Sequence, residues 1–391
     1  MKNYRLLKSI AVCACVITMS SCDVIRGYIA DGKSGPNSYS FEHRDVDTIY
    51  NGSTKFVFPY AKQQIDWLDT FRFFVQSPMY MEPVSMWEAL DKKTDTQGVL
   101  IIYNDSIIYE RCKGDITTDR LATVFSVSKS ITSLLCGIAV DEGYIRSIDD
   151  PVTDYLPELK ECDPMWQKLT VSHLLDMRSG LDFSDLYSFK FKDLKRLNAM
   201  AKLNYGKDLM KQIRGLKFAC EPGTQYNYES MTAAVLGIVI QRATGQRYVD
   251  YLSEKVWKPL QMESPAVINI DSRKNDMPHA FGGISTTMKD LAKIGRLYLN
   301  MGMWDGKRIV SEEWIRQSTE YNPDNEGYHR NWYNTGWIEG FRPEYPGYYA
   351  EGIREQVLYV NPYMNLIMIR FGLKGDQYSH VPFMFEILSN I

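Results

Sequence analysis

The sequence has few of the residues that build metal centres or strongly charged surfaces. Among its 391 residues there are 5 histidines and 7 cysteines, and neither a C-x-x-C nor an H-E-x-x-H string occurs. We therefore expect no metal site and no cofactor. Basic and acidic residues number 45 and 48, for a net charge of −3, which provides no strong field for binding nucleic acid. Glycine and proline follow no repeat, which excludes a collagen-like chain.

Apolar and aromatic residues are plentiful instead. Hydrophobic residues make up 45% of the chain and charged residues 24%, which are ordinary globular values and argue against disorder. The 26 tyrosines, 8 tryptophans and 16 phenylalanines indicate a large core, which is the commonest use of such residues. They also fit an aromatic-lined cleft.

The first 22 residues have the pattern of a targeting segment. A basic start is followed by the apolar run Ile10–Met19, which is too short to cross a bilayer comfortably. Small residues then precede Cys22, an order that resembles the lipobox of bacterial lipoproteins. The resemblance implies that residues 1–22 are a lipoprotein signal and that Cys22 becomes the acylated N-terminus. Ordinary secretory cleavage near Ser21 is the alternative.

In either case we expect the mature chain outside the cytoplasm. With lipid on Cys22, the protein would be anchored to a membrane of the bacterial cell envelope, either periplasmic or surface-exposed. The lipid anchor is the one membrane contact that the sequence predicts.

Composition divides the rest of the chain into an N-terminal extension and a main domain. Residues 23–95 form the extension, of which 23 to about 40 carry Gly, Ser, Pro and Asn and predict a tether. Residues 96–391 form the main domain. Its part from about 147 to 275 has mostly helical patterns separated by polar loops.

Strand patterns occur at both ends of the main domain. Residues 97–112 predict a hairpin that turns at Asn104-Asp105, and residues 355–371 predict a second hairpin. Residues 381–388 predict a terminal helix. Strands at both ends with helices between them indicate an α+β fold, an α/β sandwich in which an antiparallel sheet is flanked by helices with a helical subdomain.

Ser126 and Lys129 carry the chemical argument. Three positions apart on a helix, the two side chains share one face, about 5–6 Å apart at Cβ. The apolar residues from Ile131 to Ala139 predict that this helix is buried. Desolvation lowers the pKa of a buried lysine, so Lys129 would take the proton of Ser126 and make its hydroxyl nucleophilic. At the helix N-terminus the amide of Ser126 would favour a developing anion.

Tyr228 is the next candidate. It follows a Pro222-Gly223 turn and precedes the apolar run Ala233–Ile240, so we expect it on a loop, where functional side chains are often displayed. A tyrosine near a lysine can pass a proton to a leaving group. A purely structural tyrosine is the alternative.

Two further segments give these residues a context. Residues 169–181 (LTVSHLLDMRSGL) and 282–292 (GGISTTMKDLA) resemble the "LT-x-x-HLL-x-x-x-SGL" and "GG-x-x-ST-x-x-DLA" segments of the serine β-lactamase-related family. That family includes class C β-lactamases, D-alanyl-D-alanine carboxypeptidases and related esterases and amidases. The resemblance spans about residues 95–391 and implies a β-lactamase/transpeptidase-like fold. His173, in the first segment, is structural in the family.

The resemblance also implies roles for individual residues. Ser126 is the nucleophile, Lys129 its activating partner, and Tyr228 the tyrosine of the family's Tyr-x-Asn motif. The third residue of that motif is Ser230 here, a variant typical of the branch that includes 6-aminohexanoate-dimer hydrolase and some esterases. The backbone N–H groups of Ser126 and Ile353 are implied as the oxyanion hole.

The family's third motif, Lys-Thr-Gly or His-x-Gly, is missing. Its place is taken by Ala350–Gln356 (AEGIREQ), which resembles the "A-x-G-x-x-G-Q" segment of the same branch with Glu355 in place of the second glycine. A cation at this strand normally helps to bind a substrate carboxylate, so its loss disfavours β-lactams, although Arg354 is a candidate substitute. The loss of glycine at 355 is expected to disturb the backbone near the oxyanion hole.

The sequence therefore predicts a serine hydrolase that forms an acyl-enzyme on Ser126 and hydrolyses a small amide or ester. A β-lactamase or D-Ala-D-Ala carboxypeptidase is one alternative. A non-catalytic envelope lipoprotein that binds peptide or glycan is another. The candidate substrate-binding residues are Ser230, Gly352, Arg354, Asp182, Tyr187 and Trp337.

Overall fold

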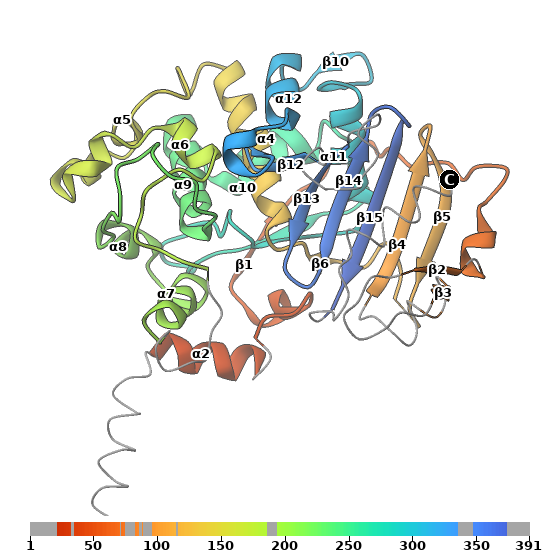
Figure 1. Ribbon diagram of the computed structural model, residues 1–391, viewed down its shortest axis with the longest axis horizontal. Helices are drawn as coiled ribbons and strands as arrows, with labels where there is room; N and C mark the ends of the chain where they lie inside the picture. Colours follow the sequence, from red (N-terminus) through yellow and green to blue (C-terminus); the bar gives the residue numbers. More distant parts are fainter. Residues whose placement is uncertain are drawn as a thin grey trace, which may run out of the picture.

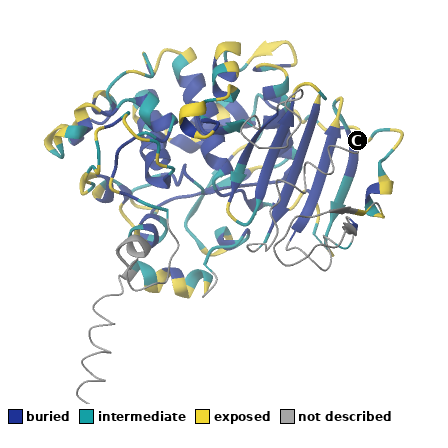
Figure 2. Cartoon of the chain, in the orientation of Figure 1, coloured by how far each residue is buried: buried dark blue, intermediate teal, exposed yellow. Residues whose placement is uncertain are grey.

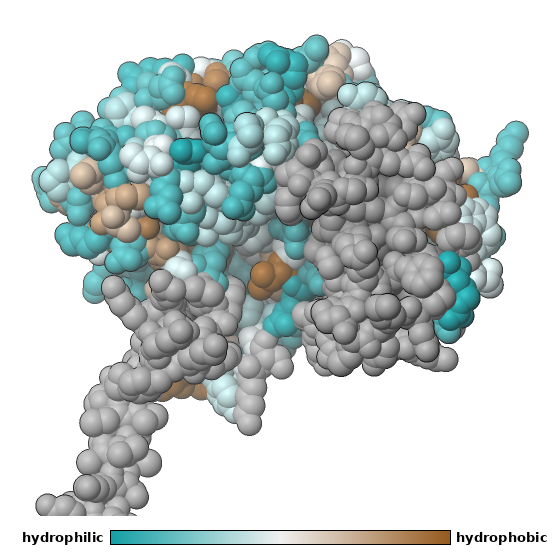
Figure 3. Space-filling view, viewed as in Figure 1, coloured by the Kyte–Doolittle hydropathy of each residue, from teal (hydrophilic) through white to brown (hydrophobic). Residues whose placement is uncertain are grey.

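The computed structural model describes residues 22–32, 35–70, 72–74, 83–85, 88, 96–114, 116–185, 194–334 and 347–373. Figure 1 shows a large sheet at one side of the molecule and a group of helices at the other. The strands of the sheet and the helices that adjoin it are mostly dark blue in Figure 2, which marks the core of the protein. The helical side presents a largely hydrophilic face with scattered hydrophobic patches (Figure 3).

The main sheet has seven strands in the described part of the chain, each antiparallel to its neighbours. Their spatial order is β11 (Tyr328–His329), β12 (Trp332–Asn334), β13 (Tyr348–Gly352), β14 (Gln356–Asn361), β15 (Leu366–Gly372), β4 (Thr96–Tyr103) and β5 (Ser106–Cys112). Because β15 pairs with β4, strands from both ends of the main domain share one sheet. Both predicted hairpins are confirmed, and the first turns at Asn104 and Asp105 with positive φ.

The strands of this sheet are apolar on both faces. In β4, Leu100 and Ile102 belong to the main core, whereas Val99 and Ile101 belong to a second cluster. Alternate residues of a strand point to opposite faces, so the two clusters lie on the two faces of the sheet. Burial on both faces explains why β4 has a continuous apolar run in the sequence rather than an alternating pattern.

Two long helices pack against the main sheet. α11 (Met288–Leu299) contacts β14, β15 and β4, and α4 (Val127–Asp141) contacts β13, β14 and helix α9 (Ser230–Thr244). Residues Val127 to Ala139 of α4 are all buried, which confirms the predicted buried helix. Burial of each large aliphatic side chain contributes roughly 1.5–3 kcal/mol, so α4 holds the residues at its N-terminus in a fixed place.

The helical region lies at the other side of the molecule (Figure 1). Besides α9 it contains α5 (Val152–Tyr155), η4 (Pro157–Glu161), η5 (Pro164–Gln167), α6 (Val171–Leu175), α7 (Leu194–Tyr205), α8 (Leu209–Arg214), α10 (Tyr248–Leu252) and the π-helical turn η7 (Ser253–Trp257). α12 (Glu312–Thr319) and η8 (Pro323–Asn325) follow later in the chain and pack near β11 and β12. The largely helical character expected for residues 147–275 is present in the described residues.

A smaller antiparallel sheet leads into α4. Its order is β1 (Val46–Ile49), β7 (Ala266–Asn269), β8 (Ile284–Thr286) and β6 (Ala122–Thr123). The hydroxyls of Thr123 and Ser285 are 2.9 Å apart, and the backbone N–H of Ile284 donates to Ser128 Oγ at 3.1 Å. These bonds tie the entry and the first turn of α4 to β8. Two small hairpins, β2 (Arg72–Phe74) with β3 (Pro83–Ser85) and β9 (Met303–Trp304) with β10 (Lys307–Arg308), complete the described strands.

The N-terminal extension differs from the expected tether. Residues Cys22–Asp31 form helix α2, which packs on α7. Gly27 allows this contact, because an added Cβ would lie 2.6 Å from the Tyr205 ring, and the Tyr205 hydroxyl donates to Asp31 at 2.5 Å. The helix is followed by η1 (Ser40–His43) and, later, η2 (Asp66–Asp69). The prediction of a tether rested on composition alone. It did not take into account that α7 offers a surface against which this segment packs as a helix.

Some sequence expectations concern other parts of the chain. Residues 1–21 of the proposed signal (1–22) and the terminal helix predicted at 381–388 lie outside the described residues. Among the helices that are described, none has the length and apolarity needed to span a membrane. His173 is placed as expected for a structural residue: it completes a capping box at the start of α6, where Thr170 N–H donates to its Nδ1 at 3.3 Å.

Candidate active site

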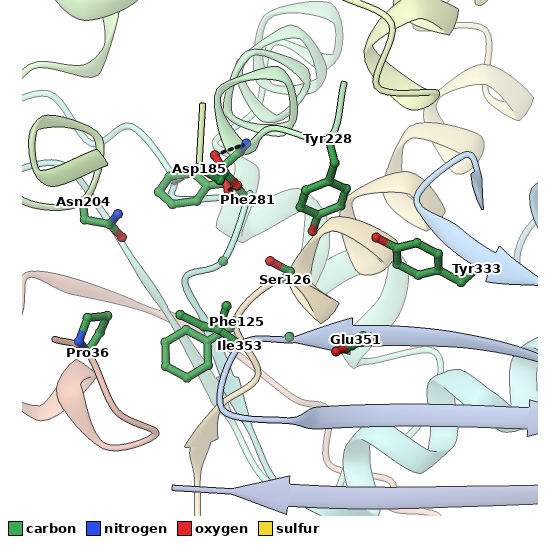
Figure 4. Close-up of a pocket in the computed structure, with 13 residues that line it drawn as sticks. Pro36, Phe125, Ser126, Asp185, Asn204, Tyr228, Phe281, Tyr333, Glu351 and Ile353 are labelled. Carbon is green, nitrogen blue, oxygen red and sulfur yellow. Dashed lines mark hydrogen bonds between the residues drawn. The ribbon is translucent and has the colours of Figure 1, made fainter. Parts of the chain in front are cut away.

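A small pocket lies where the N-termini of α4 and α9 meet the end of β13 (Figure 4). It encloses about 290 Å³, near the lower end of the roughly 300–1,000 Å³ common in small-molecule sites. Its lining residues are Pro36, Phe125, Ser126, Asp185, Asn204, Tyr228, Ser230, Phe281, Gly282, Tyr333, Glu351, Gly352 and Ile353. These come from distant parts of the chain, so the pocket exists only in the folded protein.

Ser126 stands directly before α4, as its N-cap residue. The preceding Phe125 has φ = 45°, and the strand β6 ends two residues earlier. A non-glycine residue with positive φ is uncommon, and here it turns the chain sharply from β6 into α4. The Ser126 hydroxyl consequently faces the pocket rather than the core (Figure 4).

Lys129 lies one helical turn further on, beneath Ser126. Its Nζ is 2.8 Å from Ser126 Oγ, 2.8 Å from the Phe281 carbonyl oxygen and 3.2 Å from Ser230 Oγ. The side chain is only 1% exposed. Burial lowers the pKa of Lys129 to about 8, against the opposing influence of Asp185 and Glu229. A substantial neutral fraction is therefore present slightly above neutral pH, and a neutral amine can accept a proton.

Ser230, the first residue of α9, connects Lys129 to a carboxylate that the sequence reading missed. Its backbone N–H donates to Asp185 Oδ1 at 2.8 Å, and its hydroxyl donates to Asp185 Oδ2 at 2.6 Å. Because the Ser230 hydroxyl donates its proton to Asp185, its oxygen can accept a hydrogen bond from Lys129. Asp185 thus fixes the orientation of Ser230 and adds a negative charge near Lys129.

Glu229, beside Ser230, is also buried in this region. Ser179 donates to its Oε1 at 2.7 Å, and Thr232 donates to the same oxygen. Burial raises the pKa of Glu229 to about 8, so it is mostly protonated at neutral pH. Asp185 is therefore the main fixed negative charge beside Lys129.

Tyr228 reaches the same point from the loop before α9. Its hydroxyl points towards Ser126 (Figure 4), and Lys129 Nζ lies 5.1 Å from its ring centroid. Burial raises the pKa of Tyr228, so the phenol keeps its proton at neutral pH and can donate it. The ring packs among Tyr328 and Tyr333, with centroids 5.8 and 6.5 Å away, which restricts its movement.

The end of β13 lies directly against Ser126. A Cβ added to Gly352 would lie 3.0 Å from Ser126 N and 2.4 Å from the Val124 carbonyl oxygen, so only glycine fits. Among the described residues, no acceptor takes a hydrogen bond from the backbone N–H of Ser126 or of Ile353. Both residues line the pocket, and two such donors can together hold an oxyanion.

The turn after Gly352 tolerates the missing glycine. Arg354 and Glu355 both have positive φ, 66° and 61°, where glycine is the least strained residue. Buried Arg370 supports this turn, because its guanidinium donates to the Glu355 carbonyl at 2.8 Å and pairs with the Glu355 carboxylate at 3.0 Å. The expected disturbance of the backbone is therefore offset by an ion pair that a glycine could not make.

Only some of the other predicted substrate-binding residues line the pocket in the structure. Gly352 and Ser230 line the pocket, whereas Arg354 donates to the Pro36 carbonyl at 2.9 Å and is not among the lining residues. Asp182 is exposed and also does not line the pocket. Tyr187 and Trp337 lie outside the described residues.

Besides Asp185, six lining side chains were not singled out from the sequence. They are Pro36, Phe125, Asn204, Phe281, Tyr333 and Glu351. Glu351 lies within one segment matched by the resemblance and Phe281 directly precedes another, so their positions carried a usable signal. The sequence held no comparable signal for Asn204, near the end of α7, or for Tyr333 in β12. Only the fold brings these elements close to Ser126.

The site can be compared with known proteins now that its geometry is clear. Residues 86–371 match the family model described as Beta-lactamase. The chain belongs to the Beta-lactamase family. This confirms the resemblance drawn from the sequence, and it makes the protein a serine hydrolase that acts on amide or ester bonds.

Relatives and solved structures agree with this family. The 6-aminohexanoate-dimer hydrolase of Paenarthrobacter ureafaciens is 28% identical over 307 residues, which is 73% of this chain and 74% of that protein. A Bacillus anthracis structure assigned as a 6-aminohexanoate-dimer hydrolase superposes with a TM-score of 0.74 at 20% identity, covering 95% of this chain and 94% of that one. A class C β-lactamase from Rhodobacter sphaeroides gives 0.54 at 17% identity, covering 76% and 95%. These two structures confirm the expected fold class.

The pKa of Lys129 leads to a pH prediction for this Beta-lactamase family member. If neutral Lys129 is the proton acceptor, kcat/KM rises with pH through about 8. Asp185→Asn removes a charge that raises this pKa, so the rise should move to lower pH. The measurement is a pH profile of ester hydrolysis, with Glu312→Gln, a change at an exposed residue of α12, as the control. A rise at unchanged pH in Asp185→Asn would contradict the coupling.

Gly352 supplies a second prediction. Gly352→Ala should push the end of β13 away from Ser126 and reduce kcat by about 100–1,000-fold, the effect of losing one oxyanion donor. Gly215→Ala is the control, since its added Cβ meets nothing closer than 3.5 Å. Circular dichroism and thermal unfolding check that the fold is kept, and full kcat in folded Gly352→Ala would exclude this oxyanion arrangement.

Proposed function

We propose that the protein hydrolyses a small amide or ester through an acyl-enzyme on Ser126. The observation that carries this proposal is the 2.8 Å distance between Ser126 Oγ and the Nζ of a fully buried lysine. A lysine on the surface would be protonated and unable to act as a base. Here desolvation favours the neutral amine, and the adjacent serine faces the pocket.

The chemistry proceeds in two halves. Neutral Lys129 accepts the Ser126 proton while Oγ bonds to the carbonyl carbon, and the carbonyl oxygen becomes an oxyanion near the N–H groups of Ser126 and Ile353. The phenol of Tyr228 donates its proton to the departing amine or alcohol as the C–N or C–O bond breaks, and Lys129 returns a proton to Tyr228. Water then adds to the acyl-enzyme, and the carboxylic acid leaves as Ser126 recovers its proton.

Several observations favour a small, non-β-lactam substrate. The cavity is small, and the strand that carries Lys-Thr-Gly in the wider family has Ala350, Glu351 and Gly352 here. The relative from Paenarthrobacter ureafaciens is named as a hydrolase of the 6-aminohexanoate dimer. A β-lactamase or D-Ala-D-Ala carboxypeptidase is the second candidate, supported by the family itself.

Active-site labelling tests the proposal. A fluorophosphonate probe should label the wild-type protein, and Ser126→Ala should abolish labelling completely. Lys129→Ala should reduce labelling and p-nitrophenyl acetate turnover by at least about 100-fold, since it removes the base. Labelling that persists in Ser126→Ala would exclude Ser126 as the nucleophile.

A substrate screen separates the two candidates. It compares nitrocefin, a D-Ala-D-Ala peptide, short p-nitrophenyl esters and linear amide oligomers. We expect turnover of the esters and amides, whereas efficient nitrocefin turnover would favour the β-lactamase alternative. A folded protein that neither labels nor turns over any of them would favour a non-catalytic binding protein.

We further propose that Cys22 is acylated and anchors the protein in the bacterial cell envelope. The sequence pattern before Cys22 supports this, and α2 begins at that residue. In a bacterial host the full-length chain should fractionate with membranes, and Cys22→Ala should release it. Mass spectrometry should find acyl groups on the peptide that begins at Cys22. An unmodified N-terminal peptide in the wild type would contradict the anchor.

A further inference from the structure

The two N–H groups that would hold an oxyanion belong to segments far apart in the chain. The N–H of Ser126 stands at the start of α4, shortly after β6 ends at Thr123, whereas the N–H of Ile353 stands in the turn between β13 and β14. β6 belongs to the small sheet, and β13 and β14 belong to the main sheet. An oxyanion hole works only when both donors reach one oxygen atom, so their spacing depends on how these two sheets are joined.

The chain segment directly before η1 is hydrogen-bonded to both sheets at this place. On one side, the backbone N–H of Thr123 donates to the Ser38 carbonyl at 2.8 Å. On the other side, the Ser38 hydroxyl donates to the Gly372 carbonyl and accepts from the side-chain amide of Gln356 at 3.2 Å. Ser38 is fully buried, and in a buried site bulk water does not replace a lost hydrogen-bond partner.

Gln356 and Gly372 both contact the turn that carries the Ile353 N–H. The Gln356 amide donates to the Arg354 carbonyl at 3.2 Å and to the Gly372 carbonyl at 2.6 Å. A Cβ added to Gly372 would lie 2.1 Å from the Arg354 carbonyl oxygen, so the end of β15 packs directly against this turn. Arg354 has φ = 66°, a conformation that a non-glycine residue keeps only when its surroundings hold it. Ser38 therefore supports the residue that follows Ile353.

The same segment forms part of the pocket wall. Pro36 and Ile353 both line the cavity (Figure 4), and the Pro36 carbonyl accepts from Arg354 Nε at 2.9 Å. The backbone between them and η1 is itself held, because the Asn37 N–H donates to the Ser40 hydroxyl at 2.8 Å. The segment precedes residues 86–371, which match the family model, so it adds contacts that the matched part of the chain does not contain.

We infer that Ser38 is a positioning residue of the hydrolase. Its backbone holds the entry to α4, its hydroxyl holds the turn after β13 through Gln356, and the two together set the distance between the oxyanion donors. Ser38 is fully buried and does not line the pocket, so it acts through the backbone geometry and not on the substrate itself. The inference rests on the proposed function, because it concerns the oxyanion site of the same reaction.

Replacing the carbonyl oxygen of the substrate by sulfur makes the spacing measurable. Sulfur accepts hydrogen bonds weakly, so p-nitrophenyl thionoacetate gains less from the two donors than p-nitrophenyl acetate does. Ser38→Ala should lower kcat/KM for the acetate about tenfold, which is less than the loss of a whole donor because the donor is displaced and not removed. It should change kcat/KM for the thionoacetate less than about twofold. The ratio of the two values should fall, and a ratio cancels any loss of folded protein.

Ser40→Ala is the matched control. It removes a buried hydroxyl from the same segment, and that hydroxyl is bonded within the segment to the Asn37 N–H. The acetate-to-thionoacetate ratio should stay as in the wild type. An unchanged ratio in Ser38→Ala, or an equal fall of the ratio in Ser40→Ala, would overturn the role of Ser38.

Gln356→Met tests the route from Ser38 to the turn. By itself it should lower the ratio, and in its background Ser38→Ala should lower the ratio further by less than about twofold, because coupled residues are not additive. A full further fall in that background would overturn the inference. A wild type with ordinary turnover, together with an unchanged ratio in the variants, would leave the proposed function in place. A folded wild type with neither turnover nor fluorophosphonate labelling would instead overturn the proposed function, and the inference with it.

Discussion

The structure depends on keeping one lysine amine out of water beside one serine hydroxyl. Lys129 is the most constrained side chain of the site: three oxygens surround its Nζ, and it is almost inaccessible. Burial of an ammonium group is unfavourable unless it is neutralised or paired, so the same packing that hides Lys129 lowers its pKa. The buried face of α4, its contact with α9 and the segment around Phe281 all serve this placement.

Polar residues around Lys129 hold the side chains of the site in fixed positions. Asp185 holds Ser230, and Ser230 accepts from Lys129. Glu229 lies against the same network, but burial keeps it mostly protonated, so it adds hydrogen bonds without a second full charge. In a site of low dielectric such a chain of satisfied bonds is rigid, which suits a reaction whose catalytic power comes from positioned groups.

The N-terminal segment takes part in the site as well. Pro36 lines the pocket and accepts from Arg354. Ser38 donates to the Gly372 carbonyl and accepts from Gln356, so this segment is hydrogen-bonded to β14 and β15. Arg354, which the sequence offered for binding a substrate carboxylate, donates to the Pro36 carbonyl at this junction instead. The charge of the described pocket is left to Asp185 and Glu351.

The sequence by itself determined the buried helix after Ser126 and the two hairpins, because these follow from short-range spacing and apolar pattern. Its ordered motifs also proposed Ser126, Lys129 and Tyr228 together, and the structure brings these three side chains to one place. It missed Asp185, Asn204 and Tyr333, and it misjudged helix α2 and the direction of Arg354. Only the tertiary structure decided those, since each depends on elements that are distant in the sequence: Ser230 lies 45 positions from Asp185, and Pro36 lies 318 positions from Arg354. The same is true of the pKa of Lys129: a sequence can predict that a lysine is buried, but its proton affinity is set by the oxygens and charges that folding brings around it.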